Sequence, residues 1–161
     1  MSRPELIHGT CIVVDETGVL LRGPSGAGKS DLALRLIEAG GVLVADDQIE
    51  LTPEPEGLVA APPERLAGIL EVRGVGIVPM AYCSRTFIGL VVDLVAPAEI
   101  PRLSERSFVP VAGRELPRIL IAPFEVSAVA KLRVAARTIA IDTPLFGPGT
   151  TIPARKRGEV R

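Results

Sequence analysis

The sequence predicts a single α/β domain in which a mixed β-sheet is flanked by helices. Three observations predict this fold class. Apolar runs of strand length recur along the chain, two segments have the spacing of amphipathic helices, and a glycine-rich loop joins one apolar run to one of these helices. We expect the domain to cover residues 1–145. The polar and basic residues 146–161 are expected to form a flexible tail, because they have little apolar surface to bury.

The first elements are a predicted hairpin followed by a helix. In "IVVDETGVLLRG", residues 12–23, two apolar runs are separated by Asp, Thr and Gly, which favour a tight turn. The second run leads into the glycine-rich loop, and a helix is predicted from Ser30 to the glycine pair 40–41, where glycine favours helix termination. The apolar residues that share one face of this helix are Leu32, Ala33, Leu36 and Ile37.

The remaining elements alternate between strands and turns until a second helix. "VLVADD", residues 42–47, predicts a strand buried on both faces, and the proline-containing segment 48–66 predicts a short edge hairpin with a turn. Strands are predicted over 87–95 and 118–123, separated by a polar stretch from Glu99 to Arg114. The last helix is predicted within 125–139. Its apolar side consists of Val126, Val129, Leu132 and Ala136.

Composition and charge exclude several classes of function. The chain has 18 basic and 19 acidic residues, so its net charge of −1 gives no overall attraction to nucleic acid or an anionic membrane. Its uncharged runs are shorter than the roughly 18 apolar residues that span a bilayer, and the first residues lack a secretory signal. We therefore expect a cytoplasmic protein. Cys11 and Cys83 lack CxxC spacing and are expected to be buried thiols.

The glycine-rich loop matches G-x-x-x-x-G-K-[ST] at every fixed position and lies between a predicted strand and a predicted helix. Glycines allow the backbone to wrap a phosphate with its N–H groups pointing inward, and the helix that follows adds the positive end of its dipole. The lysine supplies a charge to the β- and γ-phosphates, and the serine hydroxyl can bind Mg²⁺. The phosphate-binding residues predicted in this way are Gly23, Pro24, Ser25, Gly26, Ala27, Gly28, Lys29 and Ser30.

Carboxylates elsewhere in the chain suit phosphoryl transfer, which needs metal ligands and an acceptor for the proton of the attacking hydroxyl. Asp46 and Asp47 end a predicted strand, and either could serve, although such a pair could also form only a turn. In "LEVRGVGIV", Glu71 and Arg73 point to the same side of any strand, either toward a site or as an exposed ion pair. His8 is the only histidine of the chain.

Four motifs together resemble the catalytic domain of the HPr kinase/phosphorylase family. These are the "HGT" start, the glycine-rich loop, "VADD" and "LEVRG", and the similarity is strong over residues 6–80. The resemblance implies a phosphate-loop (P-loop) kinase core like that of phosphoenolpyruvate carboxykinase. It also implies ATP and Mg²⁺ as cofactors, and the serine of HPr, a phosphocarrier protein of the phosphotransferase system, as the substrate. Longer members have a further N-terminal domain, so this chain resembles the short form, and members commonly assemble as hexamers.

The resemblance also assigns roles to individual residues. Lys29 and the loop amides hold the nucleotide phosphates, while Ser30 and Glu71 coordinate Mg²⁺. Asp47 accepts the proton of the serine hydroxyl, and His8 lies in the same site. By a looser alignment, Arg106 in "SERS" matches an active-site arginine. We expect Asp46 to tune Asp47 or to support the metal site.

Two segments depart from the family pattern. Members have a glycine- and alanine-rich segment where this chain has "MAYCSRTF", and an "RPGRN"-like stretch, associated with the reverse phosphorylase reaction, where it has "APFEVSA". The reverse reaction is therefore left open. Two other functions remain as alternatives: a small-molecule P-loop kinase and a non-catalytic ATP sensor. The arginines that could form the lid of a small-molecule kinase are Arg102, Arg106, Arg114 and Arg118.

Overall fold

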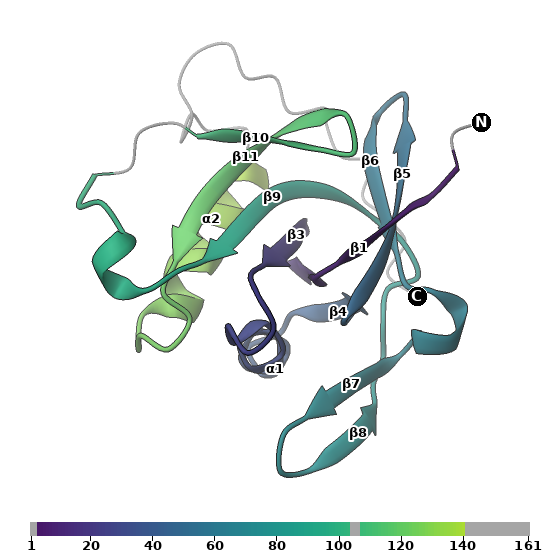
Figure 1. Ribbon diagram of the computed structural model, residues 1–161, viewed down its shortest axis with the longest axis horizontal. Helices are drawn as coiled ribbons and strands as arrows, with labels where there is room; N and C mark the ends of the chain where they lie inside the picture. Colours follow the sequence, from purple (N-terminus) through teal and green to yellow (C-terminus); the bar gives the residue numbers. More distant parts are fainter. Residues whose placement is uncertain (1–2, 104–106, 141–161) are drawn as a thin grey trace.

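The computed structural model describes residues 3–103 and 107–140, which form one mixed β-sheet with two helices and a projecting hairpin (Figure 1). The strands of the sheet are β1 (Glu5–His8), β2 (Thr10–Val14), β3 (Thr17–Arg22), β4 (Val42–Ala45), β5 (Gln48–Glu54), β6 (Gly57–Ala61), β9 (Thr86–Leu94), β10 (Phe108–Val111) and β11 (Arg114–Ile121). The hairpin consists of β7 (Ile69–Val72) and β8 (Gly76–Pro79), and the helices are α1 (Lys29–Glu38) and α2 (Ala128–Ala140). The predicted α/β class with a mixed sheet is confirmed.

The sheet places the carboxyl ends of four strands, β3, β4, β9 and β11, at one edge. Its order is β1-β5-β6-β9-β3-β2-β4, and β11 pairs with β9 while β10 pairs with β11. Strand β9 runs parallel to both β3 and β11. Strand β4 is antiparallel to β2, and β2 is antiparallel to β3, so β4 has the same direction as β3. The residues that follow β3, β4 and β11 therefore emerge at the same edge.

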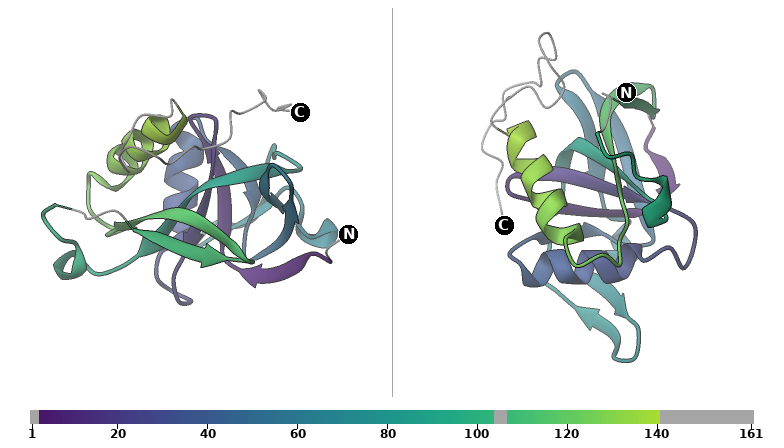
Figure 2. Two further views of the ribbon diagram at one scale, coloured as in Figure 1. Left: turned by 90° about the horizontal axis from the view of Figure 1, so that it is seen from above. Right: turned by 90° about the vertical axis from the view of Figure 1, so that its left-hand side faces the viewer.

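Two apolar cores stabilise the domain, one on each face of the sheet. On one face α1 and α2 pack together, with Leu32, Leu36 and Leu132 buried against the central strands (Figure 2). On the other face the sheet curls, so that β5 and β6 cover residues such as Leu20 and Val91. Because burial of apolar surface contributes about 25 cal/mol per Å², these two aliphatic cores stabilise a chain that has few aromatic residues.

Several local predictions are confirmed. The β2–β3 hairpin closes in the "DETG" segment, where Asp15 and Glu16 both adopt positive φ, 45° and 67°. Both cysteines are buried and free. Burial raises the pKa of the Cys11 thiol, and the nearby Cys83 raises it further.

No helix in residues 3–103 and 107–140 has the length and apolar character needed to span a membrane.

Other local predictions are wrong. Strands β1 and β10 were not expected from the sequence, because each has only four residues, of which none in β1 and one in β10 is buried. The β5–β6 hairpin does not form the edge of the sheet, because β1 pairs with β5. Pro53 is tolerated in β5 because the pairing with β1 ends at Leu51. Helix α2 begins at Ala128, so Val126 lies before it and is exposed instead of packing on its apolar side. The predicted tail lies outside the described residues.

Candidate active site

The phosphate loop has the backbone conformation that its glycines predict. It runs from the end of β3 to the start of α1, with Gly26 at φ 82° and Gly28 at φ 101°. Residues with a side chain adopt such angles at a cost of about 1 kcal/mol or more. The Ala27 N–H donates to the Pro24 carbonyl at 3.0 Å, which closes the turn. The loop thereby presents backbone N–H groups and the N-terminus of α1 to one side.

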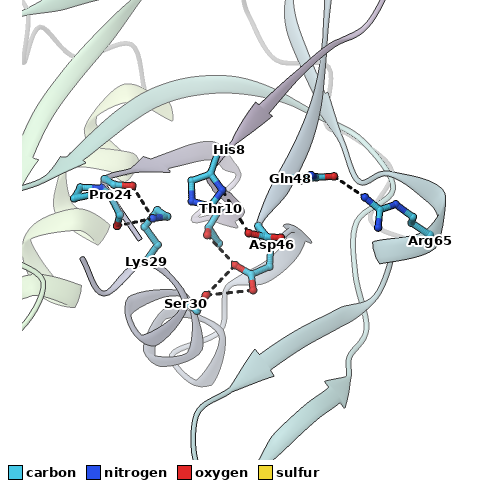
Figure 3. Close-up of polar contacts among 10 residues, drawn as sticks. His8, Thr10, Pro24, Lys29, Ser30, Asp46, Gln48 and Arg65 are labelled. Atoms are coloured by element: carbon cyan, nitrogen blue, oxygen red, sulfur yellow. Dashed lines mark hydrogen bonds and ion pairs between the residues drawn. The ribbon is translucent and has the colours of Figure 1, made fainter. Parts of the chain in front are cut away.

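Lys29 is folded back onto this loop. Its Nζ atom donates hydrogen bonds to the carbonyl oxygens of Gly23, at 2.6 Å, and Pro24, at 3.0 Å (Figure 3). Burial lowers the pKa of the Lys29 ammonium, and the nearby carboxylates of Asp46 and Asp47 oppose that shift. The carbonyl oxygens of Gly23 and Pro24 therefore compensate the desolvated ammonium charge of Lys29. The oxygens of a bound phosphate could replace these carbonyls.

Asp46 connects β2, β4 and α1 through its buried carboxylate. Ser30 Oγ donates to Oδ1 at 3.0 Å and lies 3.2 Å from Oδ2, and Thr10 Oγ1 donates to Oδ1 at 2.9 Å. Cys11 of β2 pairs with Ala45 of the antiparallel strand β4. Thr10, which precedes Cys11, and Asp46, which follows Ala45, therefore meet at the same edge of the sheet. Thr10, which is fully buried, was not singled out by sequence reasoning; its place in "HGT" was the available signal.

Asp47 points in a different direction from its neighbour. It adopts a φ of 70°, its backbone carbonyl accepts the Gly9 N–H at 3.2 Å, and its side chain is 68% exposed. Its Oδ1 atom lies 3.4 Å from Nδ1 of His8, because β1 aligns His8 with Gln48 of β5. The lone histidine is therefore positioned beside the carboxylate that the sequence predicts as proton acceptor.

A cleft of about 530 Å³ joins these groups. The candidate site residues from the sequence that line it are His8, Ser25, Gly26, Gly28, Lys29, Ser30, Asp46, Asp47 and Glu71. Gly23, Pro24 and Ala27 belong to the loop but do not line the cleft. Phe124, from the segment between β11 and α2, also lines it and was not predicted as a site residue.

Glu71 and Arg73 approach the cleft from the β7–β8 hairpin. Both are exposed and both line it, as expected for residues that point to the same side. No ion pair joins them within the part of the chain that the structure describes. Within residues 3–103 and 107–140, no three or more His, Cys, Asp or Glu side chains are grouped so that they could hold a metal ion.

Three of the four arginines considered as a lid, Arg102, Arg114 and Arg118, do not gather at the cleft. Arg114 donates to the backbone carbonyl of Glu54, and Arg118 pairs with Asp93 at 3.2 Å. Arg102 is exposed, and none of these three lines the cleft. Arg106 lies outside the described residues.

Sequence comparisons identify relatives of this chain. A family model described as HPr Serine kinase C-terminal domain matches residues 1–102. A protein of Geobacillus sp. (strain WCH70), named HPr kinase/phosphorylase, is 46% identical over 96 residues, which are 55% of this chain and 31% of the relative. A protein of the same name from Geobacillus kaustophilus (strain HTA426) is 41% identical over 127 residues, 71% of this chain and 41% of the relative. The chain spans less than half the length of these curated relatives.

The fold has a solved counterpart as well. The structure titled "Structure of the Hpr(Ser) kinase/phosphatase from Coxiella burnetii" matches with a TM-score of 0.74 and 27% sequence identity. The match covers 86% of this chain and 93% of that chain, so it includes elements beyond the 102 residues of the family model. With the family model matching more than half of its residues, the chain belongs to the HPr serine kinase C-terminal domain family.

Proposed function

We propose that this protein is an ATP-dependent protein-serine kinase that phosphorylates HPr or an HPr-like phosphocarrier. The observation that carries the proposal is the cleft in which Lys29 and Ser30 of the phosphate loop share one space with the accessible carboxylate of Asp47. Family membership supports the same activity, because its relatives are named HPr kinase/phosphorylase. A nucleotide and a protein hydroxyl could meet in this cleft.

In the proposed mechanism Asp47 is the general base. A serine hydroxyl is a weak nucleophile at neutral pH, so a carboxylate within hydrogen-bond reach must take its proton during transfer. The serine oxygen forms a bond to the γ-phosphorus while the bond from that phosphorus to the bridging oxygen of the β-phosphate breaks, which releases ADP. The proton passes to Asp47, and His8, at 3.4 Å, orients this carboxylate. The exposure of Asp47 suits an acceptor that arrives from solvent on another protein.

The phosphate loop holds the other substrate in this proposal. Its N–H groups and the α1 N-terminus contact the β- and γ-phosphates, and the Lys29 ammonium exchanges its bonds to Gly23 and Pro24 for phosphate oxygens. Since the burial of Lys29 removes water around its charge, the interaction with a phosphate is stronger than it would be at the surface. The γ-phosphorus then lies between Lys29 and the approaching hydroxyl.

The residues at the cleft fit Mg²⁺. The Ser30 hydroxyl and the Asp46 carboxylate are 3.0 Å apart and are hard oxygen donors, and Mg²⁺ commonly uses one or two such protein groups together with substrate phosphates. Ser30 and Asp46 would hold the ion, and Glu71 would complete its environment from the β7–β8 hairpin. When bound, Mg²⁺ neutralises charge that develops on the phosphates. Thr10 keeps the Asp46 carboxylate turned toward Ser30.

We further propose a cytoplasmic protein that assembles as a homo-oligomer, a hexamer by resemblance, with neither nucleic acid nor membrane as a partner. A monomer in light scattering contradicts the assembly. The segment 122–128 contains no arginine, so the proposal covers the kinase direction, and the reverse phosphorylase reaction stays open. The small-molecule kinase is less well supported, because Arg114 and Arg118 bind elsewhere. A pure ATP sensor would not need Asp47 beside the phosphate loop.

One experiment tests the proposed function against both alternatives. Purified protein is incubated with γ-labelled ATP, Mg²⁺ and purified HPr-like carrier, and the labelled residue is then identified. Label on a carrier serine supports the proposal. Label on a small molecule from an added metabolite mixture indicates the small-molecule kinase, and ATP binding without any transfer indicates the sensor. The matched control uses a carrier in which the acceptor serine is replaced by alanine.

A further inference from the structure

The exposed aromatic side chain of Phe124 lies against the phosphate loop. Its side chain is 72% exposed, although it lines the cleft and belongs to the segment between β11 and α2. A Cβ atom built on Gly28 would lie 2.9 Å from Cζ of the ring and 3.3 Å and 3.4 Å from its two Cε atoms. The Cζ end of one ring face therefore lies over Gly28, while most of the side chain stays exposed.

The segment that carries Phe124 is tied to the helix that begins at the phosphate loop. Arg35 of α1 donates to the Pro123 carbonyl and also pairs with Asp31 at 3.0 Å. On the other side of Phe124, the carboxylate of Glu125 pairs with Lys131 at 3.2 Å. The position of the ring relative to the loop is thus set by contacts on both sides.

The topology places Phe124 and the acceptor groups on opposite sides of the phosphate loop. The strands at this edge follow the order β11-β9-β3-β2-β4. The loop follows β3, Asp46 and Asp47 follow β4, and Phe124 follows β11. A triphosphate that lies along the loop with its terminal phosphate toward Asp47 consequently directs its nucleoside toward Phe124.

We propose that Phe124 is the nucleoside-binding residue of this cleft, with the base of the bound nucleoside triphosphate stacked on its ring. This inference rests on the proposed function for the direction of the triphosphate. A flat aromatic face next to a phosphate site recognises a base through its π-face. Since every base has such a face, Phe124 contributes affinity for the nucleoside and little discrimination among bases.

The test compares a ligand that has a base with one that lacks it. Dissociation constants for Mg·ATP and for Mg·tripolyphosphate are measured by calorimetry on the wild type, Phe124→Ala and Phe124→Trp. The matched control is Val126→Ala, which removes another exposed apolar side chain of the same segment that does not line the cleft. Circular dichroism and melting temperature establish that each variant is folded.

We expect Phe124→Ala to weaken ATP binding about tenfold or more, the effect of losing one stacked base. Tripolyphosphate binding stays unchanged, Phe124→Trp retains ATP affinity, and Val126→Ala behaves as the wild type. An equal loss for both ligands, or no loss for ATP, overturns the inference. So does unchanged ATP affinity with weakened carrier phosphorylation, which assigns Phe124 to the acceptor. A wild-type protein that binds neither ligand contradicts the proposed function instead.

Discussion

Asp46 and Asp47 are adjacent in the chain, yet their carboxylates lie in opposite surroundings. Asp46 is 8% exposed and accepts hydrogen bonds from Thr10 and Ser30, whereas the side chain of Asp47 is 68% exposed and lies beside His8. The left-handed backbone of Asp47, φ 70°, turns the second side chain away from the first. One carboxylate is therefore suited to a fixed metal site and the other to an incoming acceptor.

Asp47→Asn should abolish phosphoryl transfer while ATP still binds. The amide cannot accept the hydroxyl proton, and loss of a general base lowers rates by about 10²–10⁴-fold. ATP affinity should change little, because the phosphate loop is intact. Transfer rate and ATP affinity are measured separately on the same preparation, with His8→Asn as a companion variant that should lose less activity. A parallel fall of both quantities in Asp47→Asn would remove Asp47 from the role of base.

Thr10→Val should raise the Mg²⁺ concentration required for activity. Valine keeps the shape of threonine but cannot donate to Asp46, so the carboxylate keeps Ser30 as its hydrogen-bond partner and loses its fixed orientation. A lost hydrogen bond of about 1 kcal/mol corresponds to about a fivefold shift in the Mg²⁺ midpoint. The measurement is a Mg²⁺ titration of kinase activity at saturating ATP. Thr10→Ser, which retains the hydroxyl, should restore the wild-type midpoint, and failure of that rescue would argue for a packing effect.

The phosphate loop and α1 were predictable from sequence because their constraints are local. The glycine spacing, Lys29 and the apolar face of the helix follow from neighbours in the chain. The residues alone left Asp46 and Asp47 equivalent, and only the family resemblance separated them, because their different surroundings depend on the pairing of β2 with β4 and of β1 with β5. Phe124 was missed for a similar reason: its approach to Gly28 exists only once β11 joins β9.

Glu71→Gln should increase the Mg²⁺ requirement without affecting the fold. Glu71 is exposed and lines the cleft from the β7–β8 hairpin, so its replacement removes a negative charge near the proposed metal site and leaves the core unchanged. Glu64→Gln, an exposed residue outside the cleft, serves as the charge-matched control. Both variants are assayed across a Mg²⁺ series. If the midpoints of Glu71→Gln and the wild type coincide, Glu71 has no part in metal binding.

Gly18→Ala should destabilise the whole domain, because the backbone of β9 occupies the space that a side chain at this residue would need. A Cβ atom at Gly18 would lie 2.1 Å from the carbonyl oxygen of Phe87, which is backbone and cannot move without separating the strands.

We expect the free energy of unfolding to fall by about 3 kcal/mol or more. The matched control is Gly40→Ala, where φ is 105° and no atom lies within 4 Å of the added Cβ. There the cost is backbone strain alone, about 1 kcal/mol. Urea denaturation measures both changes. Similar losses in the two variants would mean that β3 and β9 can separate at Gly18 without disturbing the sheet, and the phosphate loop that follows β3 would then have a less rigid support than the pairing indicates.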